Sequence, residues 1–233
     1  MLRNELTLQN PLRLMAQDNE NILPEGGFGA VLARAGVGKT ALLVQLALNS
    51  LLRGKNVLHI SLDDPVNKVN LWYKEVFYNL TKSYDMKTST ELWESLLPQR
   101  FIMTFKVDGF SVPKLEERLT DLKEQNIFFP QAVFIDGLPF DQSQTGPLSD
   151  LKTLAKNQSM LVWFTIQTHR HEEPGPEGMP VQLQNVADLF DVAIQIEPEG
   201  KKIHLKVLLG GSSNSAYPEL LLDPATMLVK NQE

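Results

Sequence analysis

The sequence predicts an α/β fold in which a mostly parallel sheet is flanked by helices on both faces and is extended by antiparallel strands near the C-terminus. Two patterns carry this prediction. Short apolar runs alternate with helical patterns five times between residues 30 and 166, which is typical of parallel strands joined by crossover helices. Beyond residue 190, strand patterns follow one another without helices between them, which favours hairpin pairing.

The first half of the chain begins with residues 1–25, which are polar and rich in turn residues. Strands and helices follow from the apolar periodicity, in the order strand 30–33, helix 40–53, strand 56–62, helix 66–82 and helix 91–97. We expect Asp64 to be the N-cap of helix 66–82 and Pro65 its first residue. The apolar stripe of that helix is formed by Val66, Val69, Tyr73, Val76 and Leu80.

The second half continues the alternation and then changes character. It is expected to hold strand 101–105, helix 112–125, strand 131–136, helix 148–157 and strand 160–166. A short helix near 184–190 is followed by strands near 191–196, 202–209 and 219–222. These last strands make up the expected antiparallel extension.

The composition indicates a single globular domain and excludes several kinds of functional site. The 233 residues are 42% hydrophobic, which fits one α/β domain with a full-sized core. With no cysteine, the chain has neither disulfides, thiolate metal sites nor a cysteine nucleophile. A net charge of −6 argues against a broad electrostatic grip on nucleic acid or anionic lipid. Neither a signal peptide nor a membrane span is evident near the N-terminus, so we expect a cytoplasmic protein.

The strongest motif is ARAGVGKT at residues 33–40, between an expected strand and an expected helix. It matches the phosphate-binding pattern G-x-x-x-x-G-K-[ST], except that Ala33 stands at the first glycine. Lys39 is expected to reach the outer phosphates and Thr40 to ligate Mg²⁺. The expected nucleotide-binding residues are Arg34, Ala35, Gly36, Val37, Gly38, Lys39, Thr40 and Ala41. The alternative is a glycine-containing turn with an incidental lysine.

Carboxylates and an amide follow three other expected strands. Asp136 ends the strand AVFID and is expected to act on Mg²⁺ together with Thr40, although a turn-forming aspartate before Gly137 is the alternative. Asp63 follows strand 56–62 and could orient a water as general base, or share helix capping with Asp64. Gln167 could sense the γ-phosphate, or be an ordinary polar strand end.

Together these positions resemble the RecA-like P-loop ATPases, in particular the branch that contains KaiC and the DnaB-type helicases. SLDDP at 61–65 is similar to the S-L-E-x-P segment with the catalytic Glu, FIDG at 134–137 to the Walker B strand, and FTIQTHR at 164–170 to the strand ending in Gln. The resemblance covers residues 22–223. It implies a single RecA-like nucleotide-binding domain over 1–233 that binds ATP with Mg²⁺.

Two departures from that family bear on activity. Asp63 stands where the family has a catalytic Glu, and it is one methylene shorter. The Lys-x-Arg that many members offer to a neighbouring subunit is replaced by VLLGG at 207–211, and such a cation accounts for about 10³ to 10⁵ in rate. Lys206, on one face with Lys202 and His204, either replaces the missing arginine or belongs to a solvated face.

Other features leave alternatives open. The loop with His169, Arg170 and His171 could touch nucleic acid, but Glu172, Glu173 and Glu177 offset its charge and no aromatic is interleaved. Trp72 and Tyr78 fall off the apolar stripe of their helix, so they pack in a broad apolar arc or form a protein contact.

We therefore expect a slow Mg²⁺-dependent ATPase with Asp63 and Gln167 as catalytic residues and with a regulatory or assembly role. The main alternative is a non-hydrolysing, nucleotide-gated module that assembles with itself or with partner proteins. A small-molecule kinase fits less well, because kinases place their Walker A and Walker B strands side by side and have arginine-rich lids. A DNA-processing ATPase is disfavoured by the charge of the chain.

Overall fold

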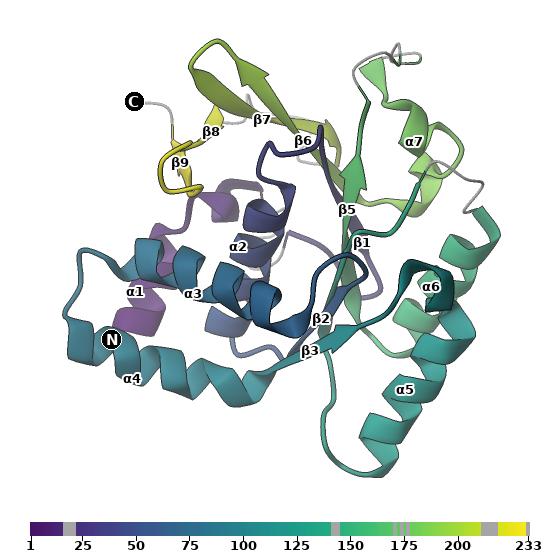
Figure 1. Cartoon of the computed structure of the whole chain (residues 1–233), viewed down its shortest axis with the longest axis horizontal. Helices are drawn as coiled ribbons and strands as arrows, with labels where there is room; N and C mark the ends of the chain where they lie inside the picture. The colour runs from purple at the N-terminus through teal and green to yellow at the C-terminus, as the bar shows by residue number, and fades with distance from the viewer. Residues whose placement is uncertain are drawn as a thin grey trace.

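The computed structural model describes residues 1–15, 22–140, 145–169, 172, 175, 178–210 and 219–231. These residues contain a nine-stranded sheet in the order β3-β2-β4-β5-β1-β6-β7-β8-β9 (Figure 1). The strands are β1 (Phe28–Ala33), β2 (Val57–Ser61), β3 (Arg100–Thr104), β4 (Ala132–Asp136), β5 (Leu161–Gln167), β6 (Val192–Glu199), β7 (Lys202–Leu209), β8 (Leu220–Leu222) and β9 (Val229–Asn231). β1 to β6 pair in parallel, and β7 to β9 are added by antiparallel pairing. This confirms the predicted architecture.

Helices cover both faces of the sheet, with α1 to α4 on one side and α5 to α7 on the other (Figure 1). The α-helices are α1 (Leu2–Gln9), α2 (Lys39–Leu52), α3 (Val66–Thr81), α4 (Met86–Leu96), α5 (Val112–Glu124), α6 (Thr145–Asn157) and α7 (Val181–Gln184). Short 3₁₀ turns occupy Pro11–Met15, Leu97–Gln99, Val107–Gly109 and Ala187–Leu189. Each face has its own apolar core, so the sheet is buried between two layers.

The central strands are mostly apolar because both of their faces are covered. All six residues of β1 and all five of β2 are buried. Their carboxyl ends meet at one edge of the sheet, since β1, β2, β4 and β5 all run in the same direction. This edge is where the loops and strand ends with the candidate site residues come together.

The N-terminal residues hold more structure than their polar composition predicts. Helix α1 buries Leu2 and Leu6, four residues apart, in the core shared with α2. Arg3 donates from Nε to the carbonyl of Leu52 at 2.8 Å and from Nη2 to that of Leu51 at 2.7 Å. These carbonyls lie in the last turn of α2, where that of Leu51 also accepts from the backbone N of Gly54, so α1 is held by capping another helix.

Three expectations about α3 and α4 are wrong. Pro65, not Asp64, is the N-cap of α3, and Asp64 instead pairs with Lys68 at 2.8 Å. Val66 is 42% exposed, so the buried stripe of α3 begins at Val69. Helix α4 begins at Met86 rather than at 91, because Asp85 caps it by accepting from the backbone N of Thr88 at 2.9 Å.

The C-terminal part differs in detail from the expectation. The predicted helix 184–190 is instead α7 and a separate 3₁₀ turn at Ala187–Leu189. A further strand, β9, pairs with β8, and the turn between them lies against α2. Gln45 of α2 fixes that turn, since its Oε1 accepts from the backbone N of Val229 at 2.9 Å and its Nε2 donates to the carbonyl of Met227.

Candidate functional site

The loop after β1 has the backbone of an anion-binding turn. Gly36 and Gly38 have φ values of 75° and 104°, and Gly38 is the N-cap of α2. A Cβ at Gly38 would lie 2.9 Å from Leu222 Cδ2, so the Leu222 side chain would have to shift to admit one. Arg34 and Ala35 are exposed, Val37 packs against the core, and Ala41 is buried in α2.

The Lys39 side chain lies across this loop. Its Nζ donates to the carbonyls of Ala33 and Arg34, each at 3.1 Å. Burial lowers the pKa of Lys39, and the carboxylates of Asp136 and Asp63 oppose that shift. A lysine held by carbonyls at a helix N-terminus is placed to exchange them for phosphate oxygens.

The carboxylate of Asp136 is held between two threonines. Thr40 donates to its Oδ2 at 2.8 Å, and Thr165 of β5 donates to its Oδ1 at 2.6 Å. Burial raises the pKa of Asp136, whereas these two hydrogen bonds lower it. The structure thus brings together Thr40 and Asp136, the two residues that the sequence predicts as metal ligands.

Asp63 reaches the same place from the neighbouring strand. Ser61 is paired with Asp136, and the backbone N of Leu62 donates to the Asp136 carbonyl at 2.9 Å, so the chain then runs beside Gly137. Gly137 has a φ of 88°, and a Cβ built there would collide with the Asp63 carboxylate. The acid of Asp63 therefore occupies the space that a side chain after Asp136 would otherwise fill.

Asp64 and Gln167 lie at the margins of the site. The backbone N of Asp64 donates to Ser61 Oγ at 2.9 Å, and its carboxylate is bound to Lys68. Gln167 ends β5 opposite Ala33, at the start of the phosphate loop, and its side chain is exposed. Gln167 is thus adjacent to the loop without being buried in it.

Residues from α2, β4 and the segment after β2 meet at this sheet edge and suit a magnesium ion bound with a nucleotide. Mg²⁺ prefers oxygen ligands and is commonly held by one or two carboxylates, a hydroxyl and substrate phosphates. The Thr40 hydroxyl, the Asp136 carboxylate and the Asp63 carboxylate provide this chemistry at one sheet edge. Thr165 would hold Asp136 in place behind it.

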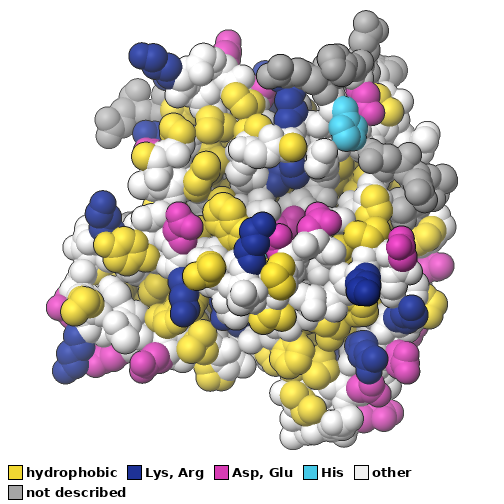
Figure 2. All heavy atoms as spheres, in the orientation of Figure 1, with side chains coloured by type: hydrophobic (Ala, Val, Ile, Leu, Met, Phe, Trp, Pro, Cys, Tyr) yellow, Lys and Arg dark blue, Asp and Glu magenta, His cyan; other side chains and the backbone are white. Residues whose placement is uncertain are grey.

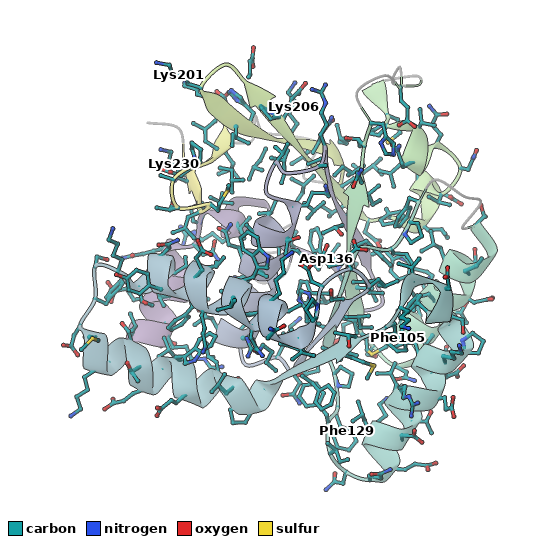
Figure 3. All side chains as sticks on the ribbon, viewed as in Figure 1. Phe105, Phe129, Asp136, Lys201, Lys206 and Lys230 are labelled. Atoms are coloured by element: carbon teal, nitrogen blue, oxygen red, sulfur yellow. The ribbon has the colours of Figure 1, made fainter. Side chains whose placement is uncertain are left out.

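Two sequence-predicted features lie elsewhere. Lys206 is on β7, well separated from Asp136 (Figure 3), and forms an ion pair with Glu197 of β6. His204, on the same face, contacts Glu219 at 2.7 Å. Of the loop after β5, Arg170, His171, Glu173 and Glu177 lie outside the described residues, as does Gly211.

The sequence reasoning missed Thr165. Its signal was weak: it is the one hydroxyl within the otherwise apolar stretch LVWFTI of β5. Register explains its place, because Ile135 pairs with Phe164 and the next residue on each strand is Asp136 and Thr165. Thr165 also accepts from the backbone N of Gly137 at 3.1 Å, which ties Gly137 to the same network.

Basic and acidic side chains are interspersed on the face drawn in Figure 2, where they form no broad area of one sign. In the described part of the chain, no helix combines the length and apolar character that crossing a bilayer requires. The arrangement of the site is thus the clearest indication of function.

Comparison with known proteins supports this interpretation. A family model described as an AAA domain matches residues 9–140, which is more than half of the chain and includes both the phosphate loop and Asp136. Comparison with curated proteins gives no match. The chain therefore belongs to the AAA domain family and has the P-loop NTPase fold and nucleotide-binding, ATPase-like function of that family.

Proposed function

We propose that this chain is a single nucleotide-binding domain that binds ATP with Mg²⁺ at residues 34–41 and hydrolyses it slowly. Thr40 and Asp136 hold the metal ion, which supplies charge neutralisation to the phosphates when bound. Lys39 leaves the Ala33 and Arg34 carbonyls to bind the outer phosphates. The observation that carries the proposal is the meeting of Thr40, Asp136 and Asp63 at one end of the sheet.

Asp63 is the proposed general base. Its carboxylate lies against Gly137, next to the carboxylate of Asp136, so it faces the place where the phosphates would lie. Many P-loop ATPases place a Glu directly after the Walker B Asp, but in this chain that residue is Gly137. Asp63 fills the resulting space from the neighbouring strand and orients a water there. Gln167, at the loop margin, is the proposed γ-phosphate sensor.

Turnover is proposed to be slow for two reasons. Asp63 is one methylene shorter than the Glu of the ATPases that this chain resembles. A water bound to its carboxylate would therefore lie farther from the γ-phosphate or attack it at a less favourable angle. Lys206, the cation nearest in sequence to the missing Lys-x-Arg, is bound to Glu197. For Lys206 to reach the nucleotide of a neighbouring subunit, its ion pair with Glu197 would have to break.

The RecA-like branch is proposed from the strand order. β5 lies between β1 and β4, so the phosphate-loop strand and the Asp136 strand are not neighbours. This arrangement supports an ATPase of the RecA type and disfavours the kinase alternative, in which the two strands are adjacent. The segment SLDDP, which starts at the last residue of β2, and the segment FTIQ, which ends β5, also support the RecA type.

The test is multiple-turnover phosphate release from ATP with Mg²⁺. Asp63→Asn is expected to lower the rate by about 10²- to 10⁴-fold while ATP affinity stays within a few-fold. Asp64→Asn, which removes the adjacent acid, and Asp121→Asn, on the surface of α5, serve as matched controls that retain the rate. Equal loss in Asp63→Asn and Asp64→Asn would refute the assignment of Asp63.

The second candidate is a nucleotide-gated module that binds ATP and assembles without turnover. The Lys206–Glu197 pair favours it, because a cation held within its own chain is not offered to a partner. Mass measurement in solution with and without ATP and Mg²⁺, on the sample used for phosphate release, separates the two. Assembly without phosphate release selects the second candidate, and release above the protein-free rate selects the first.

A further inference from the structure

A pocket is lined by α3, by α4 and the turn after it, and by the beginning of the edge strand β3. Its volume is about 520 Å³, within the range of small-molecule sites. Four of its lining residues come from one face of α3, and the others from α4, the turn after it and β3. They are Asn67, Asn70, Leu71, Lys74, Trp93, Leu97 and Arg100. Arg100 begins β3, whereas the phosphate loop lies at the opposite, carboxyl ends of the parallel strands.

The guanidinium of Arg100 is held in one orientation. Its Nη2 donates to Asn70 Oδ1 at 2.6 Å. Its central carbon lies 4.4 Å from the centroid of the Tyr73 ring and 5.3 Å from that of Trp93. Two aromatic rings and an amide thus fix the side chain before any ligand arrives, which lowers the entropic cost of binding.

Arg100 lacks a counter-charge in the described part of the chain. No carboxylate of the described residues lies within ion-pair distance of it, and its buried Nη1 has no hydrogen-bond partner among them. Burial lowers the pKa of Arg100, and the neighbouring Tyr73 opposes that shift. Arg100 is partly buried, and cations that are withdrawn from water are normally paired in proteins, so an anionic ligand would supply the missing counter-charge.

The rest of the lining defines the ligand further. Lys74 is exposed and adds a second cation, while neither Asp nor Glu is among the lining residues given above. This is a basic pocket in a chain whose net charge is −6. Leu71 and Leu97 are 62% and 40% exposed, and with the Trp93 indole they provide an apolar wall beside the two cations.

We propose that this pocket binds a small organic anion. Arg100 and Lys74 hold its carboxylate or phosphate group, Asn67 and Asn70 offer amide contacts, and its apolar part lies against Trp93, Leu71 and Leu97. The site is separate from the phosphate loop and does not depend on the function proposed for that loop.

The experiment follows the Trp93 indole N–H in ¹⁵N-labelled full-length protein, with the resonance assigned by Trp93→Phe. Four probes are titrated at constant ionic strength: benzoate, phenyl phosphate, inorganic phosphate and benzyl alcohol. Benzoate and phenyl phosphate are expected to shift the resonance saturably. Inorganic phosphate, which lacks the apolar part, is expected to bind at least about tenfold more weakly, and the uncharged alcohol to cause no saturable shift.

Variants then locate the binding. Lys74→Ala is expected to weaken benzoate and phenyl phosphate by about 10- to 100-fold, while Lys87→Ala, an equal charge loss on α4 outside the pocket, leaves both unchanged. Lys39→Ala should also leave the Trp93 response unchanged, since binding at the phosphate loop is a separate event. Arg100→Gln should abolish the saturable shift of the Trp93 resonance. Its circular dichroism spectrum must match that of the parent, which shows that the variant is folded. Equal affinities in Lys74→Ala and Lys87→Ala, or no saturable shift with either aryl anion, would overturn the proposal.

Discussion

The carboxylate of Asp136 depends on its two threonine neighbours. Thr40 is also the proposed metal ligand, so on metal binding the hydrogen bond from Thr165 to Oδ1 is the contact that keeps the carboxylate oriented. That bond also favours the charged form of an acid whose pKa burial raises. The positioning of Asp136 therefore rests on a residue that belongs to no phosphate-loop motif.

Thr165→Val tests this dependence. Losing one orienting hydrogen bond is expected to raise the Mg²⁺ concentration needed for half-maximal ATP binding by about 10- to 100-fold, as removal of a residue behind a metal ligand commonly does. Calorimetric ATP titrations at several Mg²⁺ concentrations measure it. Thr153→Val on the surface of α6 is the matched control, and an unchanged Mg²⁺ requirement in Thr165→Val would contradict the account.

Gly137 is expected to determine where Asp63 lies. A Cβ at this position meets the Asp63 carboxylate, and the positive φ of 88° disfavours alanine as well. Gly137→Ala should lower phosphate release by about 10²-fold through displacement of Asp63, with ATP affinity changed little. Gly146→Ala, in α6 with open space around it, is the control. Full activity in Gly137→Ala would show that Asp63 need not occupy this position.

Single residues were predictable from the sequence where a motif places them. Lys39, Thr40 and Asp136 follow from a loop of fixed spacing and from an acid at a strand end, and the structure brings them to one sheet edge. The contact between Asp63 and Gly137 was not predictable, because it depends on the register of β2 against β4. Thr165 depends in the same way on the register of β5.

At the scale of elements, the β8–β9 hairpin and helix α2 form one unit through Gln45. This buried side chain accepts from Val229 N at 2.9 Å and donates to the Met227 carbonyl. Gln45→Leu keeps the volume but leaves both backbone groups without their partner. We expect it to lower the free energy of unfolding by about 1–3 kcal/mol in urea titrations. Gln125→Leu, exposed at the end of α5, should change it by less than about 0.5 kcal/mol, and equal effects of the two would contradict this role.

Helices and strands were predictable where the apolar periodicity is strong. They were not predictable where a side-chain cap or pairing with a distant segment stabilises them. The apolar runs in the sequence predict strands β1 and β4 directly. Helix α1 has only Leu2 and Leu6 buried and is held by Arg3 at the end of α2, a contact that no local pattern contains. The first turn of α4 is polar and is fixed by the Asp85 cap. Strand β9 is only three residues long and depends on β8.

At the scale of the whole molecule, the buried sheet encloses a histidine. His59 of β2 is fully buried, and its Nδ1 lies 3.2 Å from the hydroxyl of Tyr73. Burial, with the positive charge of Arg100 nearby, lowers the pKa of His59 to about 3. The folded protein therefore keeps this ring neutral over the pH range in which an unfolded chain protonates it.

The lowered pKa of His59 makes the folded protein less stable toward acidic pH. Between the unfolded pKa of 6.5 and about 3, the unfolded state binds more protons at His59, so stability falls as the pH decreases below about 6.5. This residue contributes a slope of at most about 1.4 kcal/mol per pH unit. Urea unfolding at pH 7, 6 and 5 should show a shallower decline in His59→Leu than in the parent. Parallel declines would show that His59 is not the source.

The architecture as a whole was predictable because alternating strands and helices allow few topologies. The order of strands in the sheet was not, since no local sequence property records that β5 lies between β1 and β4. This order is what places Thr165 beside Asp136 and Gln167 opposite Ala33. The candidate site is thus a property of the complete sheet and not of the phosphate loop alone.

The central claim is that this assembled edge binds ATP through Lys39. Isothermal titration of ATP with Mg²⁺ into the parent and into Lys39→Ala tests it most directly, with Lys87→Ala as the matched loss of one charge. We predict one ATP per chain for the parent and for Lys87→Ala, and affinity lower by about 10- to 100-fold for Lys39→Ala. Equal affinity of Lys39→Ala and the parent would contradict the account.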